Sequence, residues 1–356
     1  MTEEAVPNLG GPLEPAPRPE RKWVRLLIIA VLAVLVIVVI KRLLGDVDWE
    51  QVGDALALLH PWQMAVLVGG LLVRQFLNAM PLSLFIPGCS PLRAMQNDQA
   101  AILMTTVAPP PSDVAMRLAM FTSWGIAPTS GLAGTVMNTV SFYVVRFGAP
   151  LLGILLMLIL GSFHLGEVVP AVLSGLVSFA ILGIVWLAFR GESFTRNFAQ
   201  RLGKLVKKVR PSVDPQAWVD WAIDFRGRVV ARVPRALPGS ILAVFAMVLV
   251  DGMLIVLSLR FVGVSPAEAP AVEVLVAFLV AYPLTLFPFS GLGLLDAVVV
   301  ATLLALDVGA DEASLVAGFV VWRAVTILGP LLLGLGAVGL WKVQLIRRPS
   351  SENVDD

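Results

Sequence analysis

One apolar stretch near the end of the chain, Ala281 to Arg323, constrains the fold most, because it suits a lipid bilayer but cannot form one continuous helix. Its interruptions are Pro283, Pro288, Ser290, Gly291 and Gly293. Backbone N–H and C=O groups left without partners in hydrocarbon cost several kcal/mol each, so a break persists only where protein or a water-filled cavity surrounds it. The stretch therefore predicts a built site inside a membrane protein.

A second interrupted stretch lies earlier, at Gln99 to Phe121. Its breaks are Pro109, Pro110 and Pro111. In both stretches a short apolar run meets the break, an aspartate follows (Asp113 or Asp296), and a second short helical run begins. This pattern predicts two helical hairpins, at residues 97–121 and 272–306, which meet inside the membrane.

The composition supports a membrane protein, since 58% of the residues are hydrophobic and only 14% are charged. The single cysteine, Cys89, excludes an intramolecular disulfide framework. The two histidines, His60 and His164, are too few to favour a histidine-built metal site. We therefore expect neither a metal nor another cofactor.

Six further apolar segments are predicted to cross the bilayer, which takes about 20 residues of helix. They are residues 26–40, 62–86, 131–161, 168–189, 237–262 and 314–341. The expected fold class is an all-α polytopic membrane protein with about six full transmembrane helices and two re-entrant hairpins. The expected organisation is a first membrane half at 23–161, a fourth span at 162–189 and the remaining spans at 236–341.

The polar segments indicate the orientation. Residues 190–235 carry eleven basic and four acidic side chains, with apolar and aromatic residues at helical spacing. This pattern favours amphipathic helices on an anionic leaflet over a nucleic-acid interface. Because cytoplasmic loops carry the excess of Lys and Arg, we expect this segment, the disordered tail 1–22 and the tail 342–356 to lie in the cytoplasm.

The two halves echo each other. Arg74 and Arg146 are 72 positions apart, and so are Asp251 and Arg323. The sequence FYVVRFGAPLLG around Arg146 also resembles FVVWRAVTILGPLLLG around Arg323. Inverted halves with broken helices near the midplane are typical of secondary transporters, so we predict an inverted repeat. Chance similarity between apolar segments is the alternative.

Four arginines lie in the predicted membrane region: Arg74, Arg117, Arg146 and Arg323. A charge at the bilayer centre costs at least about 3 kcal/mol, so each needs a partner or a cavity. One interpretation is structural, with Arg74 paired to Asp251 and Arg117 to Asp113. The other is functional, with arginines binding a headgroup phosphate through their planar fork of donors. Asn78, near Arg74, belongs to the same polar group.

Other polar and small residues have simpler interpretations. Asp113 and Asp296 follow their breaks, where an acid caps a helix N-terminus; lining of a cavity or proton coupling is the alternative. The glycines of the last span are expected to be close-packing positions rather than a site. They are Gly329, Gly334, Gly336 and Gly339.

Three segments resemble the transmembrane domain of lysylphosphatidylglycerol synthases and their stand-alone, flippase-like relatives. They are WEQVGDALALLHPWQ from Trp49, PPPSDVAMRLAMF from Pro109, and the stretch from PFSGLGLLDAVVV to LLLGLGAVGL that starts at Pro288. The family pattern at the last break is Pro-Gly-Gly-x-Gly followed by a glutamate, where this chain has Gly291, Gly293 and Asp296. The resemblance covers about residues 26–341 and implies a bacterial or archaeal origin.

The resemblance implies lipid translocation or lipid handling, and it argues against aminoacyl transfer, which the full synthases carry out in a separate soluble domain. We therefore expect a non-enzymatic transporter of an anionic phospholipid or a polyprenyl-phosphate-linked envelope intermediate in a bacterial plasma membrane. The alternative is an accessory subunit that anchors a cell-envelope glycosyltransferase or lipid-modifying enzyme. An intramembrane transferase is disfavoured because the sequence shows no nucleophile or acid/base constellation.

Overall fold

The computed structural model describes residues 59–109, 111–160, 165–190, 215–306 and 309–346, together with residues 57, 196–197 and 200–201. The predicted first span at residues 26–40, the two tails, Pro110 and most of the basic segment before residue 215 lie outside the described residues. Within the described part, all regular structure is helical.

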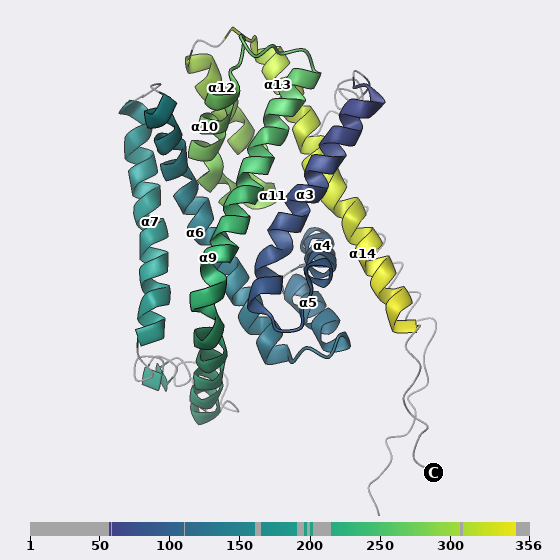
Figure 1. Ribbon diagram of the computed structural model, residues 1–356, viewed down its shortest axis with the longest axis vertical. Coiled ribbons are helices and arrows are strands. Elements are labelled where there is room, and N and C mark those ends of the chain that lie inside the picture. Colours follow the sequence, from purple (N-terminus) through teal and green to yellow (C-terminus); the bar gives the residue numbers. More distant parts are fainter. Residues whose placement is uncertain are drawn as a thin grey trace, which may run out of the picture. The chain divides into compact units, whose positions relative to one another are not determined.

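The helices follow one another along the chain without a strand in the described ranges (Figure 1). They are α3 (Pro61–Phe85), α4 (Pro91–Val107), α5 (Ser112–Ser123), α6 (Pro128–Leu160), α7 (Leu165–Arg190), α9 (Pro215–Phe261), α10 (Ala271–Ala281), the 3-10 helix η1 (Tyr282–Leu286), α11 (Pro288–Gly291), α12 (Leu294–Ala305), α13 (Glu312–Arg323), the π-helical η2 (Ala324–Leu328) and α14 (Gly329–Ile346).

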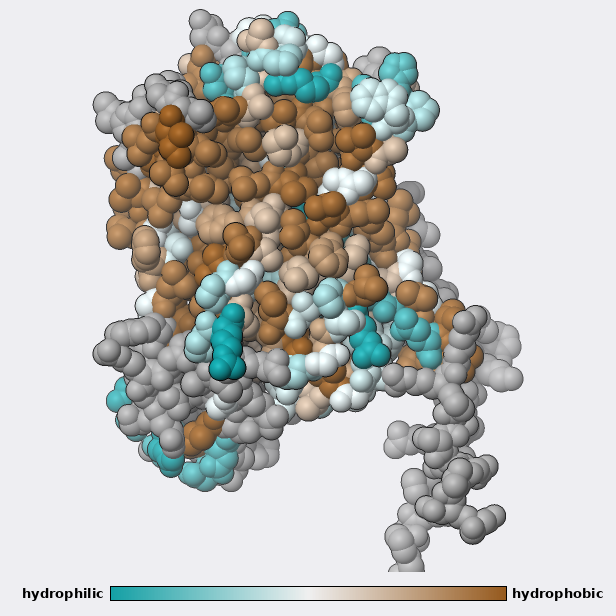
Figure 2. Space-filling model, in the orientation of Figure 1, coloured by the Kyte–Doolittle hydropathy of each residue, from teal (hydrophilic) through white to brown (hydrophobic). Residues whose placement is uncertain are grey.

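Four described segments are long and apolar enough to cross a bilayer. They are Pro61–Phe85, Pro128–Ile159, Val233–Phe261 and Glu312–Ile346. The surface agrees, because a broad hydrophobic band separates hydrophilic groups at the two ends (Figure 2). Large side chains such as Leu158 and Leu332 are exposed on these helices, and Phe179 is exposed on α7. An all-α membrane protein is thereby confirmed, and the total of six spans stays a prediction.

The first interrupted stretch forms two helices, α4 and α5, which pack against each other. The helix ends at Val107, and the next helix begins at Ser112. Proline cannot donate a backbone hydrogen bond, so the break leaves carbonyls without their helical partners. The Ser112 hydroxyl lies 3.1 Å from the Ala108 oxygen, within hydrogen-bonding distance. It also lies 3.3 Å from the Met104 oxygen, which already accepts a hydrogen bond from the Ala108 N–H at 3.0 Å.

The second interrupted stretch is more irregular, because α10 passes into the short helices η1 and α11 before α12 begins. Three residues in the break have positive φ: Ser290 at 56°, Gly291 at 70° and Gly293 at 78°. L side chains rarely adopt this conformation, whereas glycine adopts it readily. The two glycines and the strained serine thus turn the chain sharply inside an apolar sequence.

The hairpins pack reciprocally on the long helices. The first hairpin, through α4, lies against α14, whereas the second, through α10, lies against α6. The helices α3 and α9 pack along each other between them (Figure 1). Each hairpin therefore contacts a long helix that is distant from it in the sequence.

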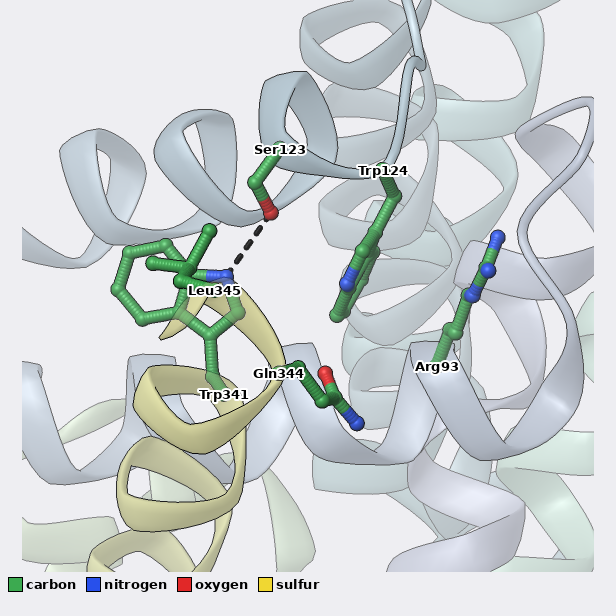
Figure 3. A pocket seen from close by; sticks show the side chains of 6 residues that line it. All are labelled: Arg93, Ser123, Trp124, Trp341, Gln344 and Leu345. Atoms are coloured by element: carbon green, nitrogen blue, oxygen red, sulfur yellow. Dashed lines mark hydrogen bonds between the residues drawn. The ribbon is translucent and has the colours of Figure 1, made fainter. Parts of the chain in front are cut away.

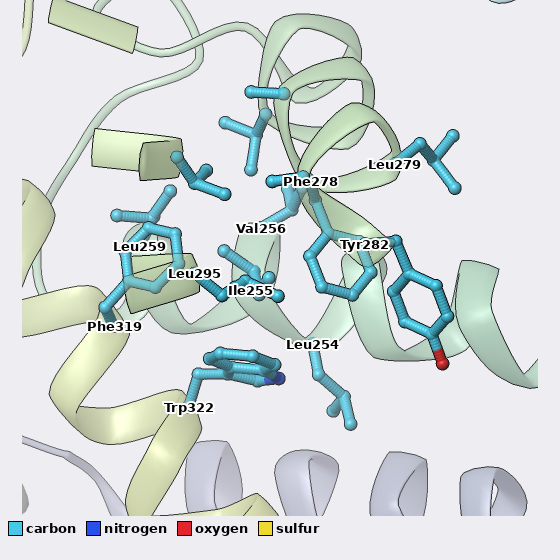
Figure 4. Close-up of a cluster of buried hydrophobic side chains, with 14 of the residues drawn as sticks. Leu254, Ile255, Val256, Leu259, Phe278, Leu279, Tyr282, Leu295, Phe319 and Trp322 are labelled. Atoms are coloured by element: carbon cyan, nitrogen blue, oxygen red, sulfur yellow. The ribbon is translucent and has the colours of Figure 1, made fainter. Parts of the chain in front are cut away.

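An aromatic cluster fixes the second hairpin to its neighbours (Figure 4). Phe278 of α10 makes edge-to-face contacts with Tyr282 and Trp322, at ring-centroid distances of 5.4 and 5.9 Å. Phe319 contacts the same Trp322 ring at 5.8 Å. Leu254 and other apolar side chains of α9 complete this buried cluster. Such pairs contribute about 0.5–1.5 kcal/mol beyond area burial, so the cluster makes a rigid base for the break.

Two long helices differ from their predicted spans. The helix α9 runs unbroken from Pro215 to Phe261, so the second part of the basic segment continues the span instead of forming a separate surface helix. The last span passes through the π-helical turn η2 directly after Arg323. The Thr326 hydroxyl donates to the Trp322 carbonyl at 2.8 Å, which supplies a side-chain partner at this irregularity. Single π-helical turns frequently occur at functional sites.

The glycines of the last span serve different purposes. A Cβ at Gly329 would lie 2.2 Å from Leu71 Cδ2, and one at Gly334 would lie 2.7 Å from the Gln99 carbonyl oxygen. The structure thereby confirms close packing at these two positions. At Gly336 and Gly339 an added Cβ meets no described residue within 4 Å, so these two positions show no close packing in the described part of the chain.

We expect Gly334→Ala to lower the free energy of unfolding by about 1–3 kcal/mol, because the added methyl group forces α14 away from α4. The matched change Gly336→Ala has open space and gains helix propensity, so it leaves stability unchanged or raises it by about 1 kcal/mol. Denaturation in detergent measures both variants. Equal effects of the two substitutions would contradict the close approach of α4 and α14.

Candidate functional site

The four predicted intramembrane arginines lie on four different helices. Arg74 is on α3, Arg117 on α5, Arg146 on α6 and Arg323 at the end of α13. Arg117 and Arg323 are only 9% and 8% exposed. Burial makes an unpaired guanidinium costly, so the partners of each side chain decide what it does.

Arg74 pairs with Asp251 of α9, as predicted. The Nη2–Oδ2 distance is 3.0 Å, and Asp251 Oδ1 accepts a second hydrogen bond from Trp322 Nε1 at 3.0 Å. The carboxylate therefore joins α3, α9 and α13 at one buried point. This pair holds the long helices together.

The polar network continues from Arg74 into the first hairpin. Arg74 Nη1 donates to Gln75 Oε1 at 2.7 Å, and Gln75 Nε2 donates to Gln99 Oε1 at 2.8 Å. Because arginine only donates, it fixes the orientation of both amides in turn. This series of hydrogen bonds ends at Gln99 Nε2, a buried donor without a partner among the described residues.

Arg117 pairs with Asp98 of α4, so the predicted pairing with Asp113 is wrong. The Nη2–Oδ1 distance is 2.6 Å, and Asn97 Oδ1 accepts from Arg117 Nη1 at 3.1 Å. Asn78 of α3 donates to the other Asp98 oxygen. Asp98 is buried on the facing helix, whereas Asp113 lies half-buried in the first turn of α5. The buried carboxylate has more to gain from the guanidinium.

Arg323 and Asp296 organise the second break. Arg323 Nη2 lies 2.8 Å from Asp296 Oδ1, and its Nε donates to both carboxylate oxygens. Asp296 Oδ2 also accepts from the Gly293 backbone N–H at 2.9 Å, so the predicted capping role is confirmed. Arg323 further reaches the Ser290 carbonyl at 3.4 Å. One ion pair thus ties α13 to the turn at Ser290 and to the start of α12.

Arg146 differs from the other three arginines. Its Nε donates to Thr285 Oγ1 at 2.9 Å, and its guanidinium lies 5.5 Å from the centre of the Tyr143 ring. It forms an ion pair with none of the acidic side chains in the described ranges. Among these four arginines, Arg146 is therefore the one whose positive charge has no carboxylate partner in the described ranges.

Arg146 and Arg323 reach the same break from two sides. Arg146 contacts it at Thr285 in η1, and Arg323 contacts it at Ser290 in α11. Phe287, between these two contacts, is exposed. An accessible broken backbone beside one compensated and one uncompensated guanidinium is the strongest candidate for a functional site in the described structure.

The comparison with known proteins agrees with this architecture. Residues 23–334 match the family described as the lysylphosphatidylglycerol synthase TM region. The chain belongs to this family. No individually curated protein matches it significantly.

The break of this lysylphosphatidylglycerol synthase TM-region protein contains every residue predicted for it. Pro288 begins α11, Ser290 and Gly291 form the turn, and Gly293 precedes α12. In the first hairpin, Pro109 and Pro111 flank the break. The helix breaks thus lie at the prolines and glycines from which they were predicted.

Several members of the network were not predicted. Asp98, Gln75, Gln99 and Thr285 all bind an arginine directly or through one amide. Asp98 gave a signal, because it is an acid at the start of a segment already expected to enter the membrane. The two glutamines and the threonine gave none, since such residues also occur at ordinary helix contacts.

In the loops that follow α9 and α12, charged side chains form hydrogen bonds with groups that are close to them in the sequence. Hydrogen bonds from the backbone and hydroxyl groups of Ser265 lower the pKa of Glu268, and those of Ser314 lower the pKa of Asp311. Arg260 donates to the carbonyls of Val264 and Ser265. Arg260 thus closes the loop that follows α9.

Proposed function

We propose that this protein moves an anionic lipid across the plasma membrane, with Arg146 as the main contact for the headgroup phosphate. Arg146 carries the proposal, because its charge lacks a carboxylate partner in the described structure and lies against the broken second hairpin. An uncompensated arginine in apolar surroundings costs at least about 3 kcal/mol. A phosphate group would compensate that charge through charge-assisted hydrogen bonds.

The other arginines take supporting roles in this proposal. Arg74 and Arg117 are held by buried carboxylates, so they shape the helix packing beside the site. Arg323 keeps the break in position through Asp296. Asp113, half-buried and without an ion pair to the described arginines, is the remaining candidate for coupling to protons.

We also propose that the two halves form an inverted repeat that rocks between two states. The equal spacing of Arg74 to Arg146 and Asp251 to Arg323 supports this, as does the reciprocal packing of α4 on α14 and α10 on α6. In this arrangement Arg74 and Asp251 are equivalent positions that pair with each other. The hairpins would be re-entrant, with both termini of the chain in a bacterial cytoplasm.

The basic segment 190–235 would bind anionic lipids at the cytoplasmic leaflet. A non-transporting accessory subunit for an envelope enzyme needs no uncompensated intramembrane cation, so Arg146 favours transport over this alternative. The cargo class stays an anionic phospholipid or a polyprenyl-phosphate-linked intermediate, since Arg146 is suited to the phosphate in either.

The test is lipid movement in reconstituted vesicles that contain labelled phosphatidylglycerol. We expect Arg146→Gln to lower the initial rate about ten-fold or more, which corresponds to a loss of about 1.4 kcal/mol. The same variant should be at least as stable as the wild type, since it removes an unpaired charge. Lys342→Gln, which removes an exposed charge at the end of α14, is the control and should stay within about two-fold. Unchanged movement by Arg146→Gln would refute the proposed role.

A further inference from the structure

A pocket distinct from the Arg146 site lies where α4 begins and α5 and α14 end (Figure 3). Its volume is about 290 Å³. The lining residues are Arg93, Ser123, Trp124, Trp341, Gln344 and Leu345. These residues come from three separate helical segments and the turn after α5, so their proximity depends on tertiary packing.

Hydrogen bonds and ring contacts fix the walls of this pocket. Trp341 Nε1 donates to Ser123 Oγ at 2.9 Å, and the Ser123 hydroxyl in turn donates to the Met120 carbonyl at 2.7 Å. The Arg93 guanidinium lies 5.7 Å from the centre of the Trp124 ring. Two indoles and one guanidinium are therefore positioned before any ligand arrives, which lowers the entropic cost of binding.

The chemistry of the lining selects an anion. Arg93 is its one charged side chain, and no carboxylate occurs among the six lining residues. The Gln344 amide adds a neutral donor and acceptor beside it. The volume is just below the range of about 300–1,000 Å³ that holds drug-sized ligands, so the pocket suits a small headgroup.

The surroundings of the pocket point to a lipid. Leu92 and Ile346, next to lining residues in the sequence, are 74% and 83% exposed. Tryptophans are enriched where a membrane meets water, and exposed leucine and isoleucine side chains beside them suit acyl chains.

The pocket also adjoins the buried network of the first hairpin. Arg93 lies one helical turn before Asn97, which accepts a hydrogen bond from Arg117. Gln96, between them in the sequence, donates to the Ala337 carbonyl at 3.1 Å and fixes α4 to α14. A headgroup bound at Arg93 would thus be seated at the outer end of the polar chain that runs between α4 and α5.

We propose that this pocket binds the phosphate headgroup of an anionic phospholipid, with Arg93 as the phosphate contact and the acyl chains lying along Leu92 and Ile346. This second lipid site does not require that the protein transports lipid. Its ligand is a monoanionic phosphodiester, which one guanidinium can balance.

The test is native mass spectrometry of the delipidated full chain in mild detergent, titrated with phosphatidylglycerol or with phosphatidylcholine of the same acyl chains. We expect the wild type to retain phosphatidylglycerol at least about five-fold more strongly than phosphatidylcholine. Arg93→Gln should lower phosphatidylglycerol retention about five- to ten-fold, whereas Arg93→Lys should retain part of it. Lys342→Gln removes a neighbouring charge outside the pocket and should change retention less than two-fold.

Two outcomes would overturn the proposal. One is equal retention by Arg93→Gln and the wild type, and the other is an equal loss in Lys342→Gln, which would indicate diffuse surface charge. Glycerophosphate in excess serves as the water-soluble competitor: failure to displace the lipid supports a lipid site, whereas full displacement would show that the pocket recognises soluble phosphate compounds. Retention of phosphatidylglycerol at Arg93 and lipid movement at Arg146 are measured in separate experiments. A negative result in one experiment therefore does not decide the other proposal.

Discussion

Replacing Asp251 by asparagine is expected to lower the free energy of unfolding by about 3–5 kcal/mol, the cost of removing one partner from a buried ion pair. Asparagine keeps an oxygen that can accept the Trp322 indole N–H, so the substitution removes the charge but little of the packing. Arg74 would then carry a buried charge without a carboxylate. Chemical denaturation of the purified protein in detergent measures the loss.

A double-mutant cycle separates the ion pair from other effects of the substitution. The double variant Arg74→Gln with Asp251→Asn removes both charges and should recover most of the stability lost in the single variant, because a neutral pair costs less than an orphaned charge. Asp113→Asn is the control, since Asp113 forms no ion pair with the described arginines, and it should change stability by less than about 0.5 kcal/mol. If the double variant is as unstable as the single one, the pair is not what holds α3 to α9.

The division between paired and unpaired arginines separates stability from function in this fold. Carboxylates neutralise three of the arginines: Asp251 and Asp98 are buried, whereas Asp296 is half-buried. The Arg74 pair joins α3 to α9, the Arg117 pair joins α5 to α4, and the Arg323 pair ties α13 to the second break. In the described part of the chain, Arg146 donates to a hydroxyl and lies against an aromatic ring, without a carboxylate partner. A protein selected for stability alone would gain by replacing it, so its presence beside the break supports a role in binding.

The sequence predicted the features that depend on local chemistry. Proline removes a backbone N–H donor and fixes φ, and glycine relaxes the limits on φ, so both breaks could be located from composition and spacing. Arg74 and Asp251 could be paired because each is a charge in an apolar span. The membrane class and the family were likewise predicted, since long apolar segments and the SGLGLLD break remain recognisable without any tertiary contact.

The features that were missed depend on contacts between distant segments. Arg117 had a plausible partner one turn away in Asp113, and only the packing of α4 on α5 shows that Asp98 is closer and more buried. The π-helical turn after Arg323 and the continuation of α9 into the basic segment leave no distinct composition signal. Tertiary packing decides such details.

Replacing Gly291 by alanine is expected to destabilise the protein by about 2–5 kcal/mol and to disrupt the second break. Its φ of 70° costs an L residue about 1–2 kcal/mol. A Cβ would also lie 2.6 Å from the Leu284 carbonyl oxygen, and backbone at that point cannot move aside as a flexible side chain would. The cost of the positive φ and the cost of the contact with the Leu284 carbonyl oxygen add, because relieving one does not relieve the other.

The neighbouring change Ser290→Gly should have the opposite sign. Ser290 already has a φ of 56°, so glycine relieves backbone strain, offset in part by the greater freedom of the unfolded chain. We expect stability between unchanged and about 1 kcal/mol higher in denaturation experiments. Because the Ser290 carbonyl that Arg323 contacts is retained, lipid movement should also survive in Ser290→Gly and fall in Gly291→Ala. Similar behaviour of the two variants would mean that the turn seen at Ser290 and Gly291 does not govern the break.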